Sequence, residues 1–420
     1  MRNFYFPPFH LSTLRKEKFF LACDKLYKLA SEYYKLKLWN DLSEDQIFGV
    51  RLTDGRIAYC SVHGYGEGDR IALAVFVGNE NFDSHRNSEM RFIDISGNEE
   101  FLLTAAQDCL ECIFETKDGL SDEELAEEKS FSKRNKIYFR ARISHPRFLK
   151  FRPLCLSTII DDAEEENILV QALQAAIEVG NKLSSKLPKR IRLGYGTPFR
   201  RKFPLLTAEG ESFKWTMENF PPYRYPKYPE AKFTPEDAKK LFAAKKAGTY
   251  HCEIFILPRP KEDDDGIVKF PVMLLTYDTK KKVLLNIAPT FSYITAPENL
   301  TASVTEFFLK YAVPKKIFVR NERTFIFLEK FCEQAGIELG EIEEMPGMDE
   351  EQEKILRFLE VQQMKDDGVV KDILDQIENS SVAELKKILP PDLKEMLRKV
   401  LESDILVSDL ADKIAAVLKD

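Results

Sequence analysis

The first part of the chain carries hydrophobic positions at two kinds of spacing. Between residues 12 and 38, apolar and aromatic side chains recur every three or four positions, which predicts an amphipathic helix. The stretch "DQIFGVRLTDGRIAYCSV" (45–62) then holds two apolar runs separated by Asp54-Gly55, a pair that predicts a β-hairpin. The run "RIALAVFVG" (70–78) predicts a third strand after it.

More elements follow before residue 185. The pattern predicts a helix over roughly 98–116, strands near "KIYFRARIS" (136–144) and "FLKFRPLCL" (148–156), and a helix over 163–183. The acidic stretch "SDEELAEEKS" (121–130) is expected to be exposed. Together these elements predict an N-terminal α+β domain over residues 12–185.

A second set of elements begins at residue 249. In order, the pattern predicts a strand in "TYHCEIFILP", a hairpin in "FPVMLLTYDTKKKVLLNIAP", a helix in "APENLTASVTEFFLKYA", a strand in "KKIFVR", a helix in "RTFIFLEKFCEQA" and a strand in "IELGEIE". Three meandering strands followed by helix, strand, helix and strand is the element order of the ribonuclease H and integrase fold. We therefore expect a ribonuclease H-like mixed-sheet domain over 249–350 and a short acidic helical appendage over 351–420.

Charge is distributed unevenly along the chain, although the net charge of its 420 residues is only −7. Residues 186–246 hold 15 Lys and Arg against 6 Asp and Glu, whereas residues 341–420 hold 11 against 21. The basic segment either binds nucleic acid or packs on the acidic tail, and we favour packing. Because residues 186–248 are rich in proline and aromatic side chains and lack clear periodicity, they are expected to form a linker.

The cysteines and the apolar runs bear on whether the protein has disulfides, a metal site or a membrane span. The seven cysteines are scattered, which is typical of reduced, buried thiols. Cys109 and Cys112 form a CxxC motif without a second pair, so we expect a structural role on one face of the predicted helix and no metal site. No run is long enough to span a bilayer and no signal-peptide pattern is present, so we expect a cytoplasmic protein without a cofactor.

The ribonuclease H order raises the question of nuclease chemistry. Such chemistry needs carboxylates on the opening strand, just after the fourth strand and on a later helix, where they hold divalent cations. The opening strand offers only Glu253, and the second position holds Arg320-Asn321, where a guanidinium repels a cation. Glu351 or Glu353 is available for the third position. We therefore predict no catalytic residues and no metal site.

Other acidic and histidine residues do not change this prediction. Asp278 is expected to cap the turn of the second hairpin. His63, Asp69, Asp83 and His85 lack the paired spacing of metal ligands.

Two groups of residues are candidates for binding. Arg320 and Asn321 stand where a strand leads into a helix, a junction that suits an anionic or carbonyl-rich partner. The alternative is that Arg320 pairs with a glutamate such as Glu322 and steadies the turn. The second group combines phosphate-attracting charge with nearby aromatic rings and consists of Arg200, Arg201 and Lys202. Its alternative is that the aromatic residues pin the linker to the domains.

Several stretches resemble an uncharacterised bacterial family in which two domains of unknown function stand in tandem. The resemblance rests on "IFGVRLTDGRIAYCSVHGYGEGDRIALAVFVG", "QDCLECIFETKDGL" and "FRARISHPRFLKFRPLCLSTIIDDAEEENILVQALQAAIEV", and later on "PVMLLTYDTKKKVLL" and "PKKIFVRNERTFIFLEKFCEQAGIEL". It implies no activity. We therefore predict a non-enzymatic binding or scaffold module with a protein partner and no membrane. The alternative is a nucleic-acid binding or processing protein with an integrase-like core.

Overall fold

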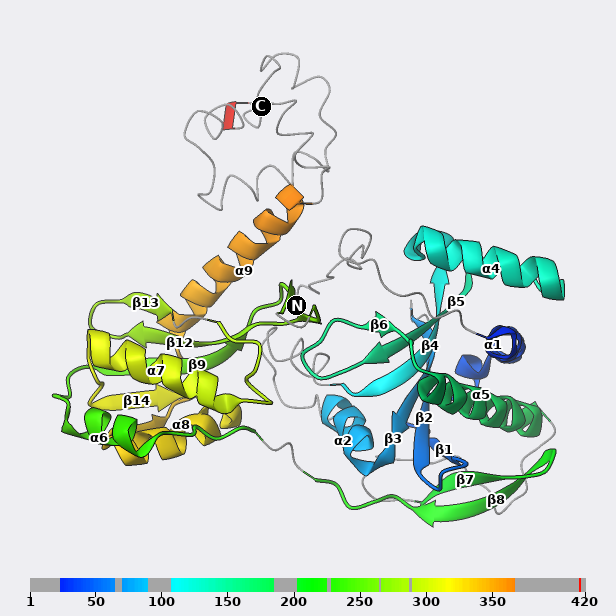
Figure 1. Ribbon diagram of the computed structural model, residues 1–420, viewed down its shortest axis with the longest axis horizontal. Helices are drawn as coiled ribbons and strands as arrows, with labels where there is room; N and C mark the ends of the chain where they lie inside the picture. The colour runs from blue at the N-terminus through cyan, green and yellow to red at the C-terminus, as the bar shows by residue number, and fades with distance from the viewer. Residues whose placement is uncertain are drawn as a thin grey trace. The chain divides into compact units, whose positions relative to one another are not determined.

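The computed structural model describes residues 23–64, 70–89, 107–184, 202–224, 228–263, 266–286, 289–366 and 415–416. The chain divides into two compact units between Lys227 and Tyr228. Both units combine helices with open sheets, so the predicted α+β fold class is confirmed (Figure 1). No helix in the described ranges is long and apolar enough to cross a membrane.

The first unit is built on one sheet of eight strands. Its spatial order is β6-β5-β4-β3-β2-β1-β7-β8. Neighbouring strands are antiparallel except β1 and β7, which run parallel. The strands are β1 (Phe48–Arg51), β2 (Ile57–His63), β3 (Ile71–Val77), β4 (Cys109–Thr116), β5 (Ile143–Phe151), β6 (Thr158–Ile159), β7 (Lys202–Glu209) and β8 (Ser212–Asn219).

Helices cover both faces of this sheet (Figure 1). The helices α1 (Asp24–Leu36) and α5 (Ala163–Ser184) pack together, and their apolar sides share a core with Cys60 and Val75. The helix α2 (Gly78–Glu89) covers the opposite face, where Phe82 stacks on Tyr59 with 4.2 Å between ring centroids. Because successive side chains of a strand point to opposite faces, Tyr59 and Cys60 serve different cores.

One predicted helix in this unit is a strand. Residues 109–116 form β4, not the end of a helix over 98–116, and residues 98–106 lie outside the described part of the chain. Six consecutive residues of β4 are buried because it is a central strand with both faces covered, and such a strand has no period-two signal. Cys109 and Cys112 therefore face different cores, which corrects the expectation that they share one face.

The strand predicted over residues 136–144 is also partly wrong. Residues 136–142 of the predicted strand "KIYFRARIS" form no strand, and β5 begins at Ile143. The acidic stretch before them forms the helix α4 (Asp122–Asn135), which Ser121 and Glu124 open with reciprocal hydrogen bonds of a capping box. Glu124 and Glu128 are buried instead of exposed, and their carboxylates contact Arg147 and His145 on β5.

The predicted linker over 186–248 contains regular structure. Strands β7 and β8 pair along their whole length and extend the first sheet beyond β1. The helix α6 (Pro235–Ala243) belongs to the second unit. Pro204 inside β7 weakens the strand signal, and the partner strand β1 lies far away in sequence, so local patterns did not indicate this hairpin.

The second unit has a five-stranded sheet with the order β13-β12-β9-β14-β15. The strands β9, β14 and β15 are parallel, while β12 is antiparallel to both β9 and β13. A separate pair consists of β10 (Lys261–Glu262) and β11 (Val268–Lys269). The strands of the main sheet are β9 (Thr249–Ile256), β12 (Val272–Asp278), β13 (Val283–Asn286), β14 (Lys316–Val319) and β15 (Glu338–Glu341).

Helices cover the two faces of this sheet differently. The helices α7 (Pro297–Tyr311) and α8 (Glu322–Ala335) lie on one face, where Tyr250 stacks on Phe308. The start of α9 (Pro346–Asp366) packs on the other face through Met345 and Met348. These strands and helices confirm the elements predicted from residue 249 onward. The helical segment begins within the domain rather than at 351, and residues 367–414 lie outside the described ranges.

The junction of β1 with β7 can be tested at Gly49, which lies opposite Leu205. A methyl group there would stand 2.5 Å from Phe203 Cε2, and the ring is fully buried. Gly49→Ala is expected to lower the free energy of unfolding by about 1–3 kcal/mol through overpacking. Urea titration followed by tryptophan fluorescence measures this, since Trp39 and Trp215 both belong to the first unit.

The matched control is Gly119→Ala, whose methyl group would meet first the flexible Glu115 side chain, at 3.3 Å. Combining Gly49→Ala with Phe203→Leu is expected to cost less than the two separate changes together, because the smaller side chain makes room. If Gly49→Ala were as stable as the control, the hairpin would not pack on β1 in solution.

Candidate functional site

The most concentrated set of polar contacts in the second unit is centred on Arg320. This residue directly follows β14, and Glu253 lies on the neighbouring parallel strand β9. The carboxylate oxygen Glu253 Oε2 accepts hydrogen bonds from Arg320 Nε at 2.9 Å and pairs with Arg320 Nη2 at 2.6 Å. The Glu253 side chain is only 3% exposed, so this charge depends on the guanidinium for compensation.

Helix α9 completes the surroundings of the guanidinium. Arg320 Nη1 donates to Asp349, and Arg320 Nη2 donates to Gln352 Oε1 at 3.0 Å. The amide of Gln352 in turn donates to Glu253 Oε2 at 2.8 Å. We call these four residues, Glu253, Arg320, Asp349 and Gln352, the arginine cluster. It ties the central strand, the end of β14 and α9 together.

Asn321 links the arginine cluster to α8. Its side-chain oxygen accepts a hydrogen bond from Thr324 N at 2.9 Å and so caps the helix, while its amide nitrogen lies 3.3 Å from Glu253 Oε1. Thr324 Oγ1 accepts from the backbone of Ile254 at 2.9 Å, which fixes the helix start against β9. The predicted pair Arg320 and Asn321 thus lies in one network, directed into the domain.

Electrostatics keep the guanidinium charged. Burial alone lowers the pKa of Arg320, but the charge of Glu253 and the hydrogen bonds to Asp349 and Glu253 outweigh it and raise the pKa above its usual value. A permanent cation stands between two carboxylates and supplies the positive charge that a metal ion would supply there. Among the described side chains, no group of three or more His, Cys, Asp and Glu is arranged to hold a metal ion.

The sequence predicted an ion pair for Arg320 as the alternative to partner binding but indicated the wrong carboxylate partner. The observed partners are Glu253 and Asp349, not Glu322. Asp349, and not Glu351 or Glu353, supplies the carboxylate from the later helix. In the parallel pair of β14 and β9, Phe318 lies opposite His251, and Arg320 and Glu253 each follow two residues later. This pairing is the signal that could have indicated Glu253 as the partner. Whether Arg320 and Asn321 bind a partner stays a prediction.

The remaining predicted residues lie elsewhere. Lys202 is the exposed first residue of β7 in the first unit, and Arg200 and Arg201 lie outside the described residues. Asp278 caps its hairpin as expected, since its Oδ1 accepts from the backbone nitrogens of Lys280 and Lys281 at 2.9 Å each.

Charged and histidine side chains in the described part of the first unit form separate pairs, and no group of three is arranged to hold a metal ion. His63 Nδ1 lies 3.2 Å from Glu44 Oε1, and a hydrogen bond from His63 lowers the pKa of Glu44. Asp83 pairs with the buried Arg86, and Asp69 lies outside the described residues. On the far side of the sheet from α5, Glu111 pairs with Arg70. Arg86 and Arg70 thus compensate the charges of Asp83 and Glu111 locally.

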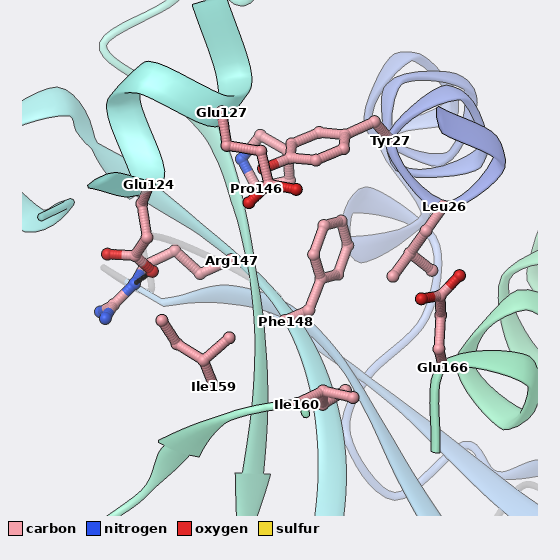
Figure 2. A pocket seen from close by; sticks show the side chains of 10 residues that line it. All are labelled: Leu26, Tyr27, Glu124, Glu127, Pro146, Arg147, Phe148, Ile159, Ile160 and Glu166. Carbon is pink, nitrogen blue, oxygen red and sulfur yellow. Dashed lines mark hydrogen bonds and ion pairs between the residues drawn. The ribbon is translucent and has the colours of Figure 1, made fainter. Parts of the chain in front are cut away.

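A small cavity lies where α1, α4 and β5 meet (Figure 2). Its volume is about 20 Å³, which holds about one water molecule and excludes a substrate. Glu124 Oε1 accepts from Arg147 Nε at 2.8 Å at its edge, and Tyr27 and Phe148 pack edge to face across it. The cavity is therefore a packing feature.

Fold and sites define the chain as two α+β domains in tandem. Residues 24–192 match the family model of a domain of unknown function, DUF7309, and residues 236–356 match that of another, DUF6930. The chain thus belongs to an uncharacterised family in which these two domains follow one another, as the resemblance of its sequence motifs indicated. No curated protein and no solved structure matches it significantly.

The arginine cluster predicts a strong coupling between Arg320 and Glu253. Arg320→Met is expected to lower the stability of the second unit by about 3–5 kcal/mol, because it leaves Glu253 buried without a counter-charge. Adding Glu253→Gln should recover part of that loss, since the remaining carboxamide carries no charge. Thermal unfolding by circular dichroism measures both, with unchanged tryptophan fluorescence of the first unit as internal control. Additive losses would contradict the coupling.

His85 predicts an acid-sensitive first unit. Burial, assisted by the charge of His63, lowers the pKa of His85 from 6.5 to about 3. The unfolded chain therefore binds this proton first, and stability falls as the pH falls from 6.5 toward 3. Between pH 7.5 and pH 5 the loss should be about 2 kcal/mol. Urea titration by tryptophan fluorescence should show a smaller loss for His85→Gln, and an equal loss would assign the acid sensitivity to other groups.

Proposed function

We propose that this protein is a non-enzymatic binding or scaffold module whose second domain is a ribonuclease H-like core without a metal centre. The strand order of the second unit supports the fold assignment. The strands β9, β12 and β13 form an antiparallel meander, which α7 follows. The strands β14 and β15, joined by α8, then extend the sheet in parallel with β9.

The single observation that carries the proposal is the position of Arg320. In a metal-dependent nuclease of this fold, carboxylates occupy the opening strand, the end of the fourth strand and a later helix. Here Glu253 and Asp349 occupy the first and third of these positions, and Arg320 occupies the second. The guanidinium contacts both carboxylates. An arginine in place of the second carboxylate thus gives an ion pair where a metal-dependent nuclease would bind a cation.

The ion pair supports a scaffold role for the second domain because it fixes a helix on the sheet. Its three charged side chains come from β9, the residue after β14 and α9, so the same contacts that displace a cation fix a helix on the sheet. A rigid sheet with a fixed helix offers a stable surface to a partner.

The proposal is tested by introducing a carboxylate at position 320. The wild-type chain is expected to gain no thermal stability from Mn²⁺ and to leave labelled single- and double-stranded DNA and RNA intact in Mg²⁺ or Mn²⁺. Arg320→Asp should acquire Mn²⁺-dependent stabilisation, since Glu253 and Asp349 then lack a counter-charge and attract a cation. Arg357→Asp, an exposed arginine of α9, is the matched control and should not respond to Mn²⁺.

Metal-dependent cleavage by the wild-type chain would contradict the proposal if Glu253→Gln abolished it. The same substitution separates this result from a contaminating nuclease, whose activity would persist in the variant.

A further inference from the structure

The second unit carries a basic surface at the edge where β9 and β14 begin. Two chain segments run side by side there, since Ala247 N donates to Val313 O at 2.9 Å and Lys315 N donates to Gly248 O at 3.0 Å. The turn after β12 joins them through a 2.9 Å hydrogen bond from Thr279 Oγ1 to Thr249 O. The ends of α6 and α7 therefore meet the β12–β13 turn at this edge.

Four exposed lysines come from these segments. None of them has an ion-pair partner among the described residues, and they are Lys245, Lys280, Lys310 and Lys315. Two acidic side chains nearby are engaged by other lysines, because Glu338 pairs with Lys316 and Asp278 lies 3.8 Å from Lys281. The net charge of −7 for the whole chain thus conceals a locally positive edge.

Two large exposed aromatic rings belong to the ends of α6 and α7. Phe242 is 64% exposed and Tyr311 is 60% exposed. Lys246 Nζ lies 5.2 Å from the centroid of the Phe242 ring, and Lys310 Nζ lies 5.8 Å from that of Tyr311. Phe307 packs against Tyr311 with 4.8 Å between ring centroids. Exposed rings offer flat stacking faces to a ligand.

We propose that this edge, formed by Phe242, Lys245, Lys280, Lys310, Tyr311 and Lys315, binds single-stranded nucleic acid. Lysines attract the phosphates, and exposed rings stack on bases, a combination that needs unpaired bases. In a duplex the bases are already stacked and the rings find no partner. An acidic protein would use the lysines alone. The inference deepens the proposed function, on which it rests, by naming the class of partner.

The experiment measures binding of a fluorescein-labelled 20-nucleotide oligo-dT to the full chain by fluorescence anisotropy. Four lysine–phosphate contacts predict an affinity about 50-fold weaker at 200 mM than at 50 mM salt. Phe242→Ala and Tyr311→Ala should each weaken binding by about 5- to 100-fold. The double change Lys310→Glu with Lys315→Glu should abolish it. A blunt 20-base-pair duplex is expected to bind more weakly than the single strand.

Matched controls exist in the first unit. Tyr138 is 52% exposed and has Arg140 at 5.4 Å from its ring, so Tyr138→Ala removes an equivalent ring, and binding should not change. Lys129→Glu with Lys133→Glu reverses two exposed lysines of α4 and should also leave binding intact. Circular dichroism confirms that each variant is folded.

Three results would overturn the proposal. They are no binding at 50 mM salt, equal binding of labelled poly-glutamate, and binding that both ring variants leave unchanged. Equal binding of poly-glutamate would favour an acidic protein partner. A denaturing gel of the same oligonucleotide after incubation with Mg²⁺ reports separately on cleavage, so failure of the non-enzymatic proposal is distinguished from failure of this surface.

Discussion

The ion pair between Arg320 and Glu253 is the contact on which the organisation of the second unit depends. Glu253 is buried on the central strand, where an uncompensated carboxylate would cost several kcal/mol. The guanidinium provides the counter-charge and at the same time binds Asp349, so the helix α9 is fixed to the sheet by the same side chain. Removal of one residue would therefore affect both the strand and the helix.

The second unit was largely predictable because its signals are local. Pro297 at the start of α7, Gly336 after α8 and the Asp278 turn each mark an element boundary within a few residues. The arginine cluster was not predictable in the same way. Asp349 and Gln352 reach Arg320 from a helix about 30 residues later in the chain, and only the docking of that helix shows which acids are used.

The first unit shows where local patterns fail. Central strands such as β4 are buried on both faces and lose the alternation that marks a strand. Strand β7 pairs with β1, more than 150 residues earlier, and no local pattern indicates a pairing of that range. Composition would place Glu124 and Glu128 at the surface, yet they are buried where Arg147 and His145 bind their carboxylates.

The two ends of the central strands in the second unit differ in how their charges are used. Beyond the end of β14, Arg320 is bound by two carboxylates and an amide inside the domain, and little of its charge reaches solvent. Before the beginning of β14, Lys315 is exposed, and its backbone pairs with Gly248 on one side and Glu338 on the other. A compensated cation stabilises the fold, whereas an uncompensated one costs repulsion and is available to a partner. The sheet thus carries a compensated cation after the end of β14 and an exposed lysine before its beginning.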